Sequence, residues 1–138
     1  NAQFNTDASG LAWTRFLDPC SGVAKTYVPI DIVTAPTVEL ANAVASKFFY
    51  ICSIDLHTSA ANNVVIAEDD TDGCGSISAG VTGGVTAAEG YNFAANGGRT
   101  IGNGNGSIAK TTTANRYLCI LTSAATQLSG VISFVSAP

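Results

Sequence analysis

KFFYICSIDL, residues 47–56, is the stretch that decides the fold, because large apolar side chains recur in it at every second position. The side chains that share this alternation are Phe48, Tyr50, Cys52, Ile54 and Leu56. In an extended strand they all lie on one face, whereas a helix would bring together residues three and four apart. The segment therefore predicts a β-strand whose apolar face lies in the core.

Similar segments continue on both sides of this strand. Thr, Val, Ile, Tyr and Phe alternate with polar residues, and clusters of Gly and Asn separate the segments, which is typical of strands joined by short turns. Pro29 indicates an edge or bulged strand around it. Residues 38–47 have the composition of a short helix. We expect further strands at 25–34, 63–68, 91–95, 107–113, 116–122 and 127–135, the last two as a hairpin across 123–126.

About seven short strands in one chain predict an all-β fold, namely an immunoglobulin-like β-sandwich with an extended N-terminal arm. A jelly roll is the alternative arrangement. We assign residues 1–22 to the arm and residues 23–138 to the sandwich domain. The length of 138 residues fits one such domain.

The arm carries large apolar side chains although it precedes the first clear strand. They are Phe4, Leu11, Trp13, Phe16 and Leu17, and the arm closes with the turn sequence DPCSG at residues 18–22. Apolar side chains of this size need a surface that covers them. Either the arm folds back as the first strand of its own sandwich, or it adds as a strand to a neighbouring subunit, so that these residues form a subunit interface.

The four cysteines are Cys20, Cys52, Cys74 and Cys119, in a chain without methionine. We expect that the chain has been processed at its N-terminus or that this sequence is its mature part. An even number of cysteines in such a chain favours disulfides and an extracellular or cell-surface location. Four cysteines allow three pairings. Cys52 and Cys74 would meet where the chain doubles back, and Cys20 would then join Cys119 and fasten the base of the arm.

The composition is rich in apolar residues, at 46%, and poor in charged residues, at 12%. A surface with so little charge favours contact with other subunits. The net charge of −4, with only six Lys and Arg residues, argues against nucleic acid as a partner. No apolar run approaches the length of about 18 residues that a membrane-spanning helix needs.

Few residues point to chemistry. His57 is the single histidine, and the residues around it supply no nucleophile elbow. The acidic run 68–73 resembles the first half of a calcium loop, but Ala79 stands where the bidentate Glu belongs. The Gly-rich stretch 97–106 precedes strand residues, so it predicts turns rather than a phosphate cradle. No spacing selects a catalytic pair among the carboxylates Asp31, Asp55 and Glu89. We expect no enzyme, and no metal ion or cofactor.

Most of the domain resembles a widespread group of small bacterial and phage-associated β-sandwich proteins of unknown function. The resemblance implies the sandwich fold and places Cys52, Cys74 and Cys119 at recurrent positions of the group. It does not cover the arm. The segments that carry it are VPIDIVTA (28–35), FFYICSIDL (48–56), NNVVIAEDDTDGCG (62–75), FAANGG (93–98), IGNGNGSIAKT (101–111) and NRYLCILTSAATQLSGVISFV (115–135).

With its arm, the chain is also similar in layout to donor-strand-exchange pilus subunits, in which a neighbour's N-terminal extension completes an immunoglobulin-like domain. We expect a secreted structural subunit of an extracellular fibril or pilus, which forms a helical homopolymer by inserting its N-terminal strand into another copy. The alternative is a carbohydrate- or receptor-binding module of a phage fibre or virion decoration protein, with a glycan as partner near Tyr91 and the Gly/Asn loops. Asn105-Gly106-Ser107 is an N-glycosylation sequon.

Overall fold

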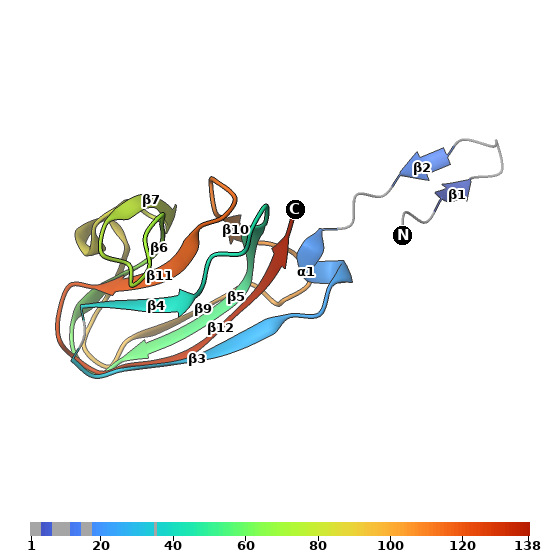
Figure 1. Ribbon diagram of the computed structural model, residues 1–138. Helices are drawn as coiled ribbons and strands as arrows, with labels where there is room; N and C mark the ends of the chain where they lie inside the picture. The colour runs from blue at the N-terminus through green and yellow to red at the C-terminus, as the bar shows by residue number, and fades with distance from the viewer. Residues whose placement is uncertain (1–3, 7–11, 15–17, 35) are drawn as a thin grey trace.

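The computed structural model describes residues 4–6, 12–14, 18–34 and 36–138, and the regular secondary structure of these residues is almost entirely β-strand (Figure 1). The helical elements are α1 (Pro19–Gly22) and the 3-10 turn η1 (Ala87–Glu89). The strands are β1 (Phe4–Thr6), β2 (Ala12–Thr14), β3 (Thr26–Ile32), β4 (Thr37–Ala41), β5 (Phe48–Thr58), β6 (Asn62–Asp69), β7 (Ile77–Thr82), β8 (Tyr91–Phe93), β9 (Gly98–Ile101), β10 (Ala109–Lys110), β11 (Tyr117–Thr122) and β12 (Leu128–Ala137).

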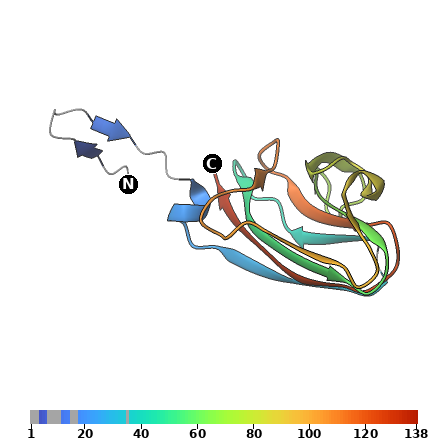
Figure 2. The same cartoon turned by 180° about the vertical axis from the view of Figure 1, so that it is seen from behind.

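The strands β3 to β12 form a sandwich of two antiparallel sheets, which face each other as two layers (Figures 1 and 2). In the first, the β5 sheet, the order is β10-β5-β12-β3, and β9 also pairs with β5. In the second, the β6 sheet, the order is β4-β11-β6-β7, and β8 also pairs with β6. The predicted all-β sandwich is therefore confirmed. β3 lies at an edge, where Pro29 is tolerated because its missing N–H breaks no ladder.

The strand pairs are nested along the chain. The first sandwich strand, β3, pairs with the last, β12, and β4 pairs with β11. Inside them, β5 pairs with β9 and β10, and β6 pairs with β7 and β8. In an immunoglobulin-like sandwich the first two strands lie in one sheet. Here β3 and β4 lie in different sheets, so the immunoglobulin-like type is not confirmed.

The core lies between the two sheets. Its fully buried side chains include Ile54 and Leu56 from β5, Ile66 from β6 and Ile120 from β11. Burial of an Ile or Leu side chain contributes about 1.5–3 kcal/mol each. Phe49 and Phe134 meet edge to face, with ring centroids 5.2 Å apart, near one end of the core.

A β-bulge at Cys52 divides the strand β5 into two halves. Ser53 lies opposite Ser133 of β12, but Ile51 lies opposite Phe134, so Cys52 is left without an opposite residue. One extra residue reverses which side chains face the core. Ile54 and Leu56 face the core, as predicted. Before the bulge it is Phe49 and Ile51 that face the core, which was not predicted. The predicted single face of β5 is wrong for Phe48, Tyr50 and Cys52, which lie outside this cluster.

Two other segments differ from what the sequence indicated. Residues 38–41, in the segment that has the composition of a short helix, lie in the strand β4, because Val38 and Leu40 pack on the core and β4 pairs with β11. The segments at 116–122 and 127–135 form strands but not a hairpin. β11 pairs with β4 and β6, whereas β12 pairs with β3 and β5, so residues 123–126 cross between the two sheets.

Candidate functional site: the root of the N-terminal arm

The arm joins the sandwich through the short helix α1, whose start is set by the sequence DPCSG. Asp18 is the N-cap, and its carboxylate accepts a hydrogen bond from the backbone N–H of Cys20 at 2.9 Å. Pro19 occupies the first turn, where its missing N–H costs nothing. The local turn chemistry that the sequence predicted here is thus confirmed as a capped helical turn.

A disulfide between Cys20 and Cys52 fastens α1 to β5, with the two Cα atoms 5.5 Å apart. Both cysteines are fully buried in a small cluster with Val135, separate from the main core, and Tyr50 and Ala137 pack against it. The bulge explains the position of Cys52, because it turns this side chain away from the core and toward α1. The disulfide fixes the point at which the arm leaves the domain.

Asp18 provides a second anchor. Its carboxylate also accepts hydrogen bonds from the backbone N–H of Ser107, at 2.9 Å, and from the Ser107 hydroxyl. The hydrogen bond from the Ser107 hydroxyl is the main reason that the pKa of Asp18 lies below its ordinary value. Burial opposes this effect, and the backbone N–H groups of Ser107 and Cys20 lower the pKa further. Ser107 belongs to the loop between β9 and β10, so α1 is tied to two parts of the β5 sheet.

Beyond this root, β1 and β2 pair with each other, Phe4 opposite Thr14 and Asn5 opposite Trp13. Among the described residues, neither strand pairs with a strand of the sandwich, and both views place them beyond α1 and away from the two sheets (Figures 1 and 2). The described part of the arm therefore does not form the first strand of its own sandwich. Of the expected interface residues, Phe4 lies in β1 and Trp13 in β2, whereas Leu11, Phe16 and Leu17 lie outside the described residues.

Large apolar side chains are exposed along the edge strand that follows α1. Tyr27 in β3 is 65% exposed, Val33 just after β3 is 57% exposed, and Val23 just after α1 is 49% exposed. On the outer side of the same sheet, the Lys110 ammonium group lies 4.3 Å from the centre of the Phe48 ring and 5.4 Å from that of Tyr50. We call Val23, Tyr27 and Val33 the β3 surface.

The second disulfide joins Cys74, in the turn between β6 and β7, to Cys119 of β11. All four cysteines are therefore disulfide-bonded, as predicted, but the favoured pairing of Cys52 with Cys74 and of Cys20 with Cys119 is wrong. That pairing assumed that β5 and β6 are neighbours in one sheet. They lie in different sheets, and β6 pairs with β11 instead, which brings the turn after β6 next to Cys119.

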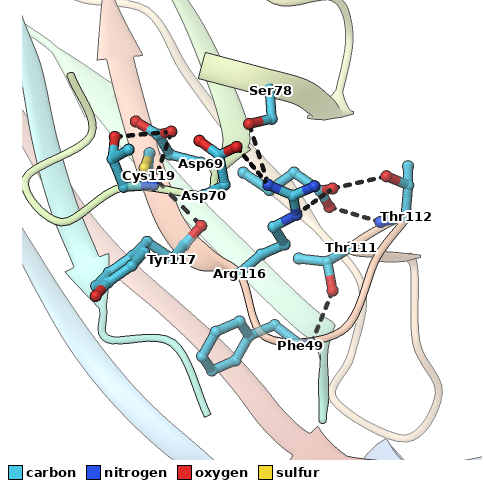
Figure 3. Close-up of polar contacts among 11 residues, drawn as sticks. Phe49, Asp69, Asp70, Ser78, Thr111, Thr112, Arg116, Tyr117 and Cys119 are labelled. Carbon is cyan, nitrogen blue, oxygen red and sulfur yellow. Dashed lines mark hydrogen bonds and ion pairs between the residues drawn. The ribbon is translucent and has the colours of Figure 1, made fainter. Parts of the chain in front are cut away.

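The acidic run at the end of β6 is engaged in structural contacts (Figure 3). The buried carboxylate of Glu68 accepts hydrogen bonds from the backbone N–H and the hydroxyl of Thr112. Asp70 pairs with the guanidinium group of Arg116 at 3.3 Å, and Arg116 also donates to Ser78. These contacts fasten the loop between β10 and β11 to the β6 sheet.

Asp69 in the same run is fully buried and anchors the turn that follows. Burial alone would raise its pKa, but hydrogen bonds from the backbone N–H of Ser76 and from Thr71 outweigh that effect and hold the pKa below its ordinary value. The described residues contain no group of three or more His, Cys, Asp and Glu side chains arranged to hold a metal ion.

The remaining polar residues that the sequence offers as candidates for catalysis, His57, Asp55, Asp31 and Glu89, lie on three different elements of the sandwich. The Nε2 atom of His57 lies 3.3 Å from a carboxylate oxygen of Asp55 on the outer face of β5, and the two side chains are 63% and 41% exposed. Contacts between polar side chains this exposed contribute little to stability. Asp31 lies on the edge strand β3. Glu89 accepts hydrogen bonds from the N–H groups of Val85 and Thr86 and closes the turn at η1.

The residues expected to bind a glycan are not gathered into one place. Tyr91 of β8 stacks with Arg99 of β9, whose guanidinium carbon lies 5.1 Å from the ring centre. The Gly/Asn loop at 102–106 lies instead beside the arm root, where the N–H of Gly104 donates to the carbonyl oxygen of Cys52 at 3.3 Å. Ser107 lies next to this loop, and its N–H and hydroxyl donate to the Asp18 carboxylate. The sequence did not predict a role for this residue.

In the part of the chain that the structure describes, no helix has the length and apolar character needed to cross a membrane. The chain matches no protein-family model, and neither the curated proteins nor the solved structures contain a match to it. The resemblance to small phage-associated sandwich proteins therefore remains a prediction, and the anchored arm root is the candidate site that the geometry itself provides.

Proposed function

We propose that the protein is an exported structural subunit that assembles with copies of itself, through its N-terminal arm, into an extracellular fibril or pilus. Two disulfides are compatible with an oxidising compartment outside the cytosol. The charged share of 12% favours a surface that other subunits cover.

One observation carries this proposal: the arm is anchored at its root but unpaired with the sandwich beyond it. Cys20 and Asp18 hold α1 against the β5 sheet, while β1 and β2 pair only with each other among the described strands. A two-stranded hairpin alone is marginally stable in water. Addition of the arm to a second copy would supply the contacts that its own sandwich does not.

We also infer that the sandwich is a jelly roll, because nested pairing of the first strand with the last is what a long hairpin rolled into two sheets produces. Each sandwich strand then has its partner within the chain. This differs from an immunoglobulin-like pilus subunit, which lacks a strand. The arm would accordingly dock on the outside of the next copy, where β3 and β4 are open sheet edges and the β3 surface is apolar.

Removal of residues 1–17 tests the proposal, because this truncation leaves Asp18 and the Cys20–Cys52 disulfide in place. We expect a folded monomer, identified by circular dichroism and by light scattering after gel filtration, whereas the full chain forms filaments in negative-stain micrographs. Filaments from the truncated chain would rule out the arm as the connection.

Changes on the β3 surface test the docking surface separately. Tyr27→Ser together with Val33→Ser should weaken assembly without loss of stability, because both side chains are largely exposed. Val85→Ser is the matched control, since Val85 is also exposed, at 45%, but lies between β7 and η1. Equal assembly of both variants would place the docking surface elsewhere.

A carbohydrate- or receptor-binding module is the second candidate, and the inferred jelly roll favours it, because this fold is frequent among lectin and capsid domains. Fold alone does not establish function. A glycan array measures this. If the monomer that lacks residues 1–17 binds the same glycans as strongly as the full chain does, that result would support this candidate over the assembly proposal.

A further inference from the structure

Three Asn-Gly steps lie close together in the chain, at Asn96, Asn103 and Asn105. In such a step the backbone nitrogen of the glycine can attack the Cγ atom of the asparagine side chain. The reaction requires that this nitrogen loses its proton and that the side chain rotates toward it. A hydrogen bond that engages either group therefore opposes it.

Two of the three steps are restrained in this way. The N–H of Gly97, after Asn96, donates to the carbonyl oxygen of Ala94 at 2.9 Å, and the N–H of Gly104, after Asn103, donates to that of Cys52 at 3.3 Å. The side-chain oxygen of Asn103 is also engaged, because it accepts a hydrogen bond of 3.0 Å from the N–H of Asn105.

The third step is unrestrained. Asn105 is exposed, and within the described chain neither its side chain nor the N–H of Gly106 takes part in a hydrogen bond. A Cβ atom added to Gly106 would meet nothing within 4 Å. Both reacting groups are thus free to approach each other.

We propose that Asn105 is a site of spontaneous modification, at which the side-chain amide is converted to a carboxylate. The Gly106 nitrogen forms a bond to Cγ of Asn105, the bond from Cγ to the side-chain nitrogen breaks, and ammonia leaves. Water then opens the resulting five-membered imide at either carbonyl and produces aspartate or isoaspartate. No oxidant or enzyme is needed, and the inference does not depend on the proposed assembly.

The modification would act on the arm root. The new carboxylate at position 105 lies two residues from Ser107, whose N–H and hydroxyl both bind the Asp18 carboxylate. A second negative charge two positions from the residue that binds Asp18 would oppose the ionised form of Asp18 that accepts these hydrogen bonds. Conversion of Asn105 therefore loosens the contact between α1 and the loop that contains Ser107.

Incubation of the full-length protein at neutral and mildly alkaline pH tests the site. Cleavage after Arg99 and Lys110 releases residues 100–110, and fragment masses separate Asn103 from Asn105. We expect the mass gain of deamidation at Asn105, several times faster than at Asn103 or Asn96, and faster at higher pH. Equal rates at the three positions, or none at Asn105, would overturn the proposal.

Gly106→Ala is the matched variant, because the space at Gly106 is open and its φ lies outside the left-handed region. The added methyl group hinders attack by the nitrogen without disturbing the fold, so conversion at Asn105 should slow severalfold at unchanged stability. An unchanged rate would contradict the mechanism.

The effect on the arm root has its own readout. Asn105→Asp should accelerate hydrogen exchange at the Ser107 amide, whereas the uncharged Asn105→Gln should not. Equal exchange in the two variants would overturn the link between the modification and the arm.

Discussion

The carboxylate of Asp18 joins two parts of the chain that lie far apart in sequence, because it caps α1 and also binds Ser107. Its lowered pKa means that the folded state favours the ionised form. The stabilisation is complete above the ordinary pKa of 3.8 and is lost as the pH falls through the lower value of the folded state. Asp18 therefore contributes at neutral pH and not in strong acid.

Asp18→Asn keeps the shape of this side chain and removes its charge. At pH 7 we expect the free energy of unfolding to fall by on the order of 1 kcal/mol, because charge-assisted hydrogen bonds are replaced by weaker ones. The difference from the original protein should shrink below pH 3.8. Urea unfolding at several pH values measures both effects.

Asp31→Asn is the control for this change, since Asp31 lies exposed on β3. It should alter the stability little at any of these pH values. A loss for Asp18→Asn that is equally large at neutral pH and in strong acid would contradict the role of the ionised carboxylate.

At this scale the sequence predicted what is local. The turn DPCSG at 18–22 is confirmed, because an N-cap Asp followed by Pro acts within a few residues. Ser107 was not predicted as the partner of Asp18, since the two are separated by 89 positions. No residue pattern specifies a contact of that range before the strands are placed.

At the scale of elements, alternation located the strands but not their irregularities. The strand predicted at 47–56 is β5, yet the bulge at Cys52 reverses its faces. The reversal depends on the register with β12, which alternation in one segment does not contain. The same limit applies to residues 38–41, whose composition is that of a helix but which form a strand because β4 pairs with β11.

Gly130 shows how closely β12 approaches β5. Its φ of 148° lies in the region that other residues rarely adopt. An added Cβ atom would overlap the carbonyl oxygen of Asp55 in β5. Gly130→Ala should therefore lower the free energy of unfolding by about 1–3 kcal/mol through backbone strain, measured by urea unfolding.

Gly75→Ala is the corresponding control, because a Cβ atom at Gly75 would meet nothing within 4 Å. It should leave the stability unchanged or raise it slightly, since alanine restricts the unfolded chain. If the two variants were equally stable, the close approach of β12 to β5 would not be a constraint.

At the scale of the whole molecule, cysteine count predicted two disulfides but not their pairing. The correct pairs follow from the nested strand order, which sets β6 beside β11 and leaves Cys52 facing α1. That order in turn depends on how two layers share one core, which is a property of the folded chain rather than of any segment. The arm is the part of the molecule that this order does not include.

The two disulfides should therefore have different local effects, although each lowers the entropy of the unfolded chain by a similar amount. They join positions 32 and 45 residues apart, and loop closure of that length is worth about 4 kcal/mol for each. Cys20→Ser with Cys52→Ser, and Cys74→Ser with Cys119→Ser, should lower the free energy of unfolding by similar amounts. Only the first pair should speed hydrogen exchange in α1 before global unfolding, because only that bond ties α1 to β5. Exchange in α1 that is equally fast in both variants would mean that the strands, and not the Cys20–Cys52 disulfide, hold the root of the arm.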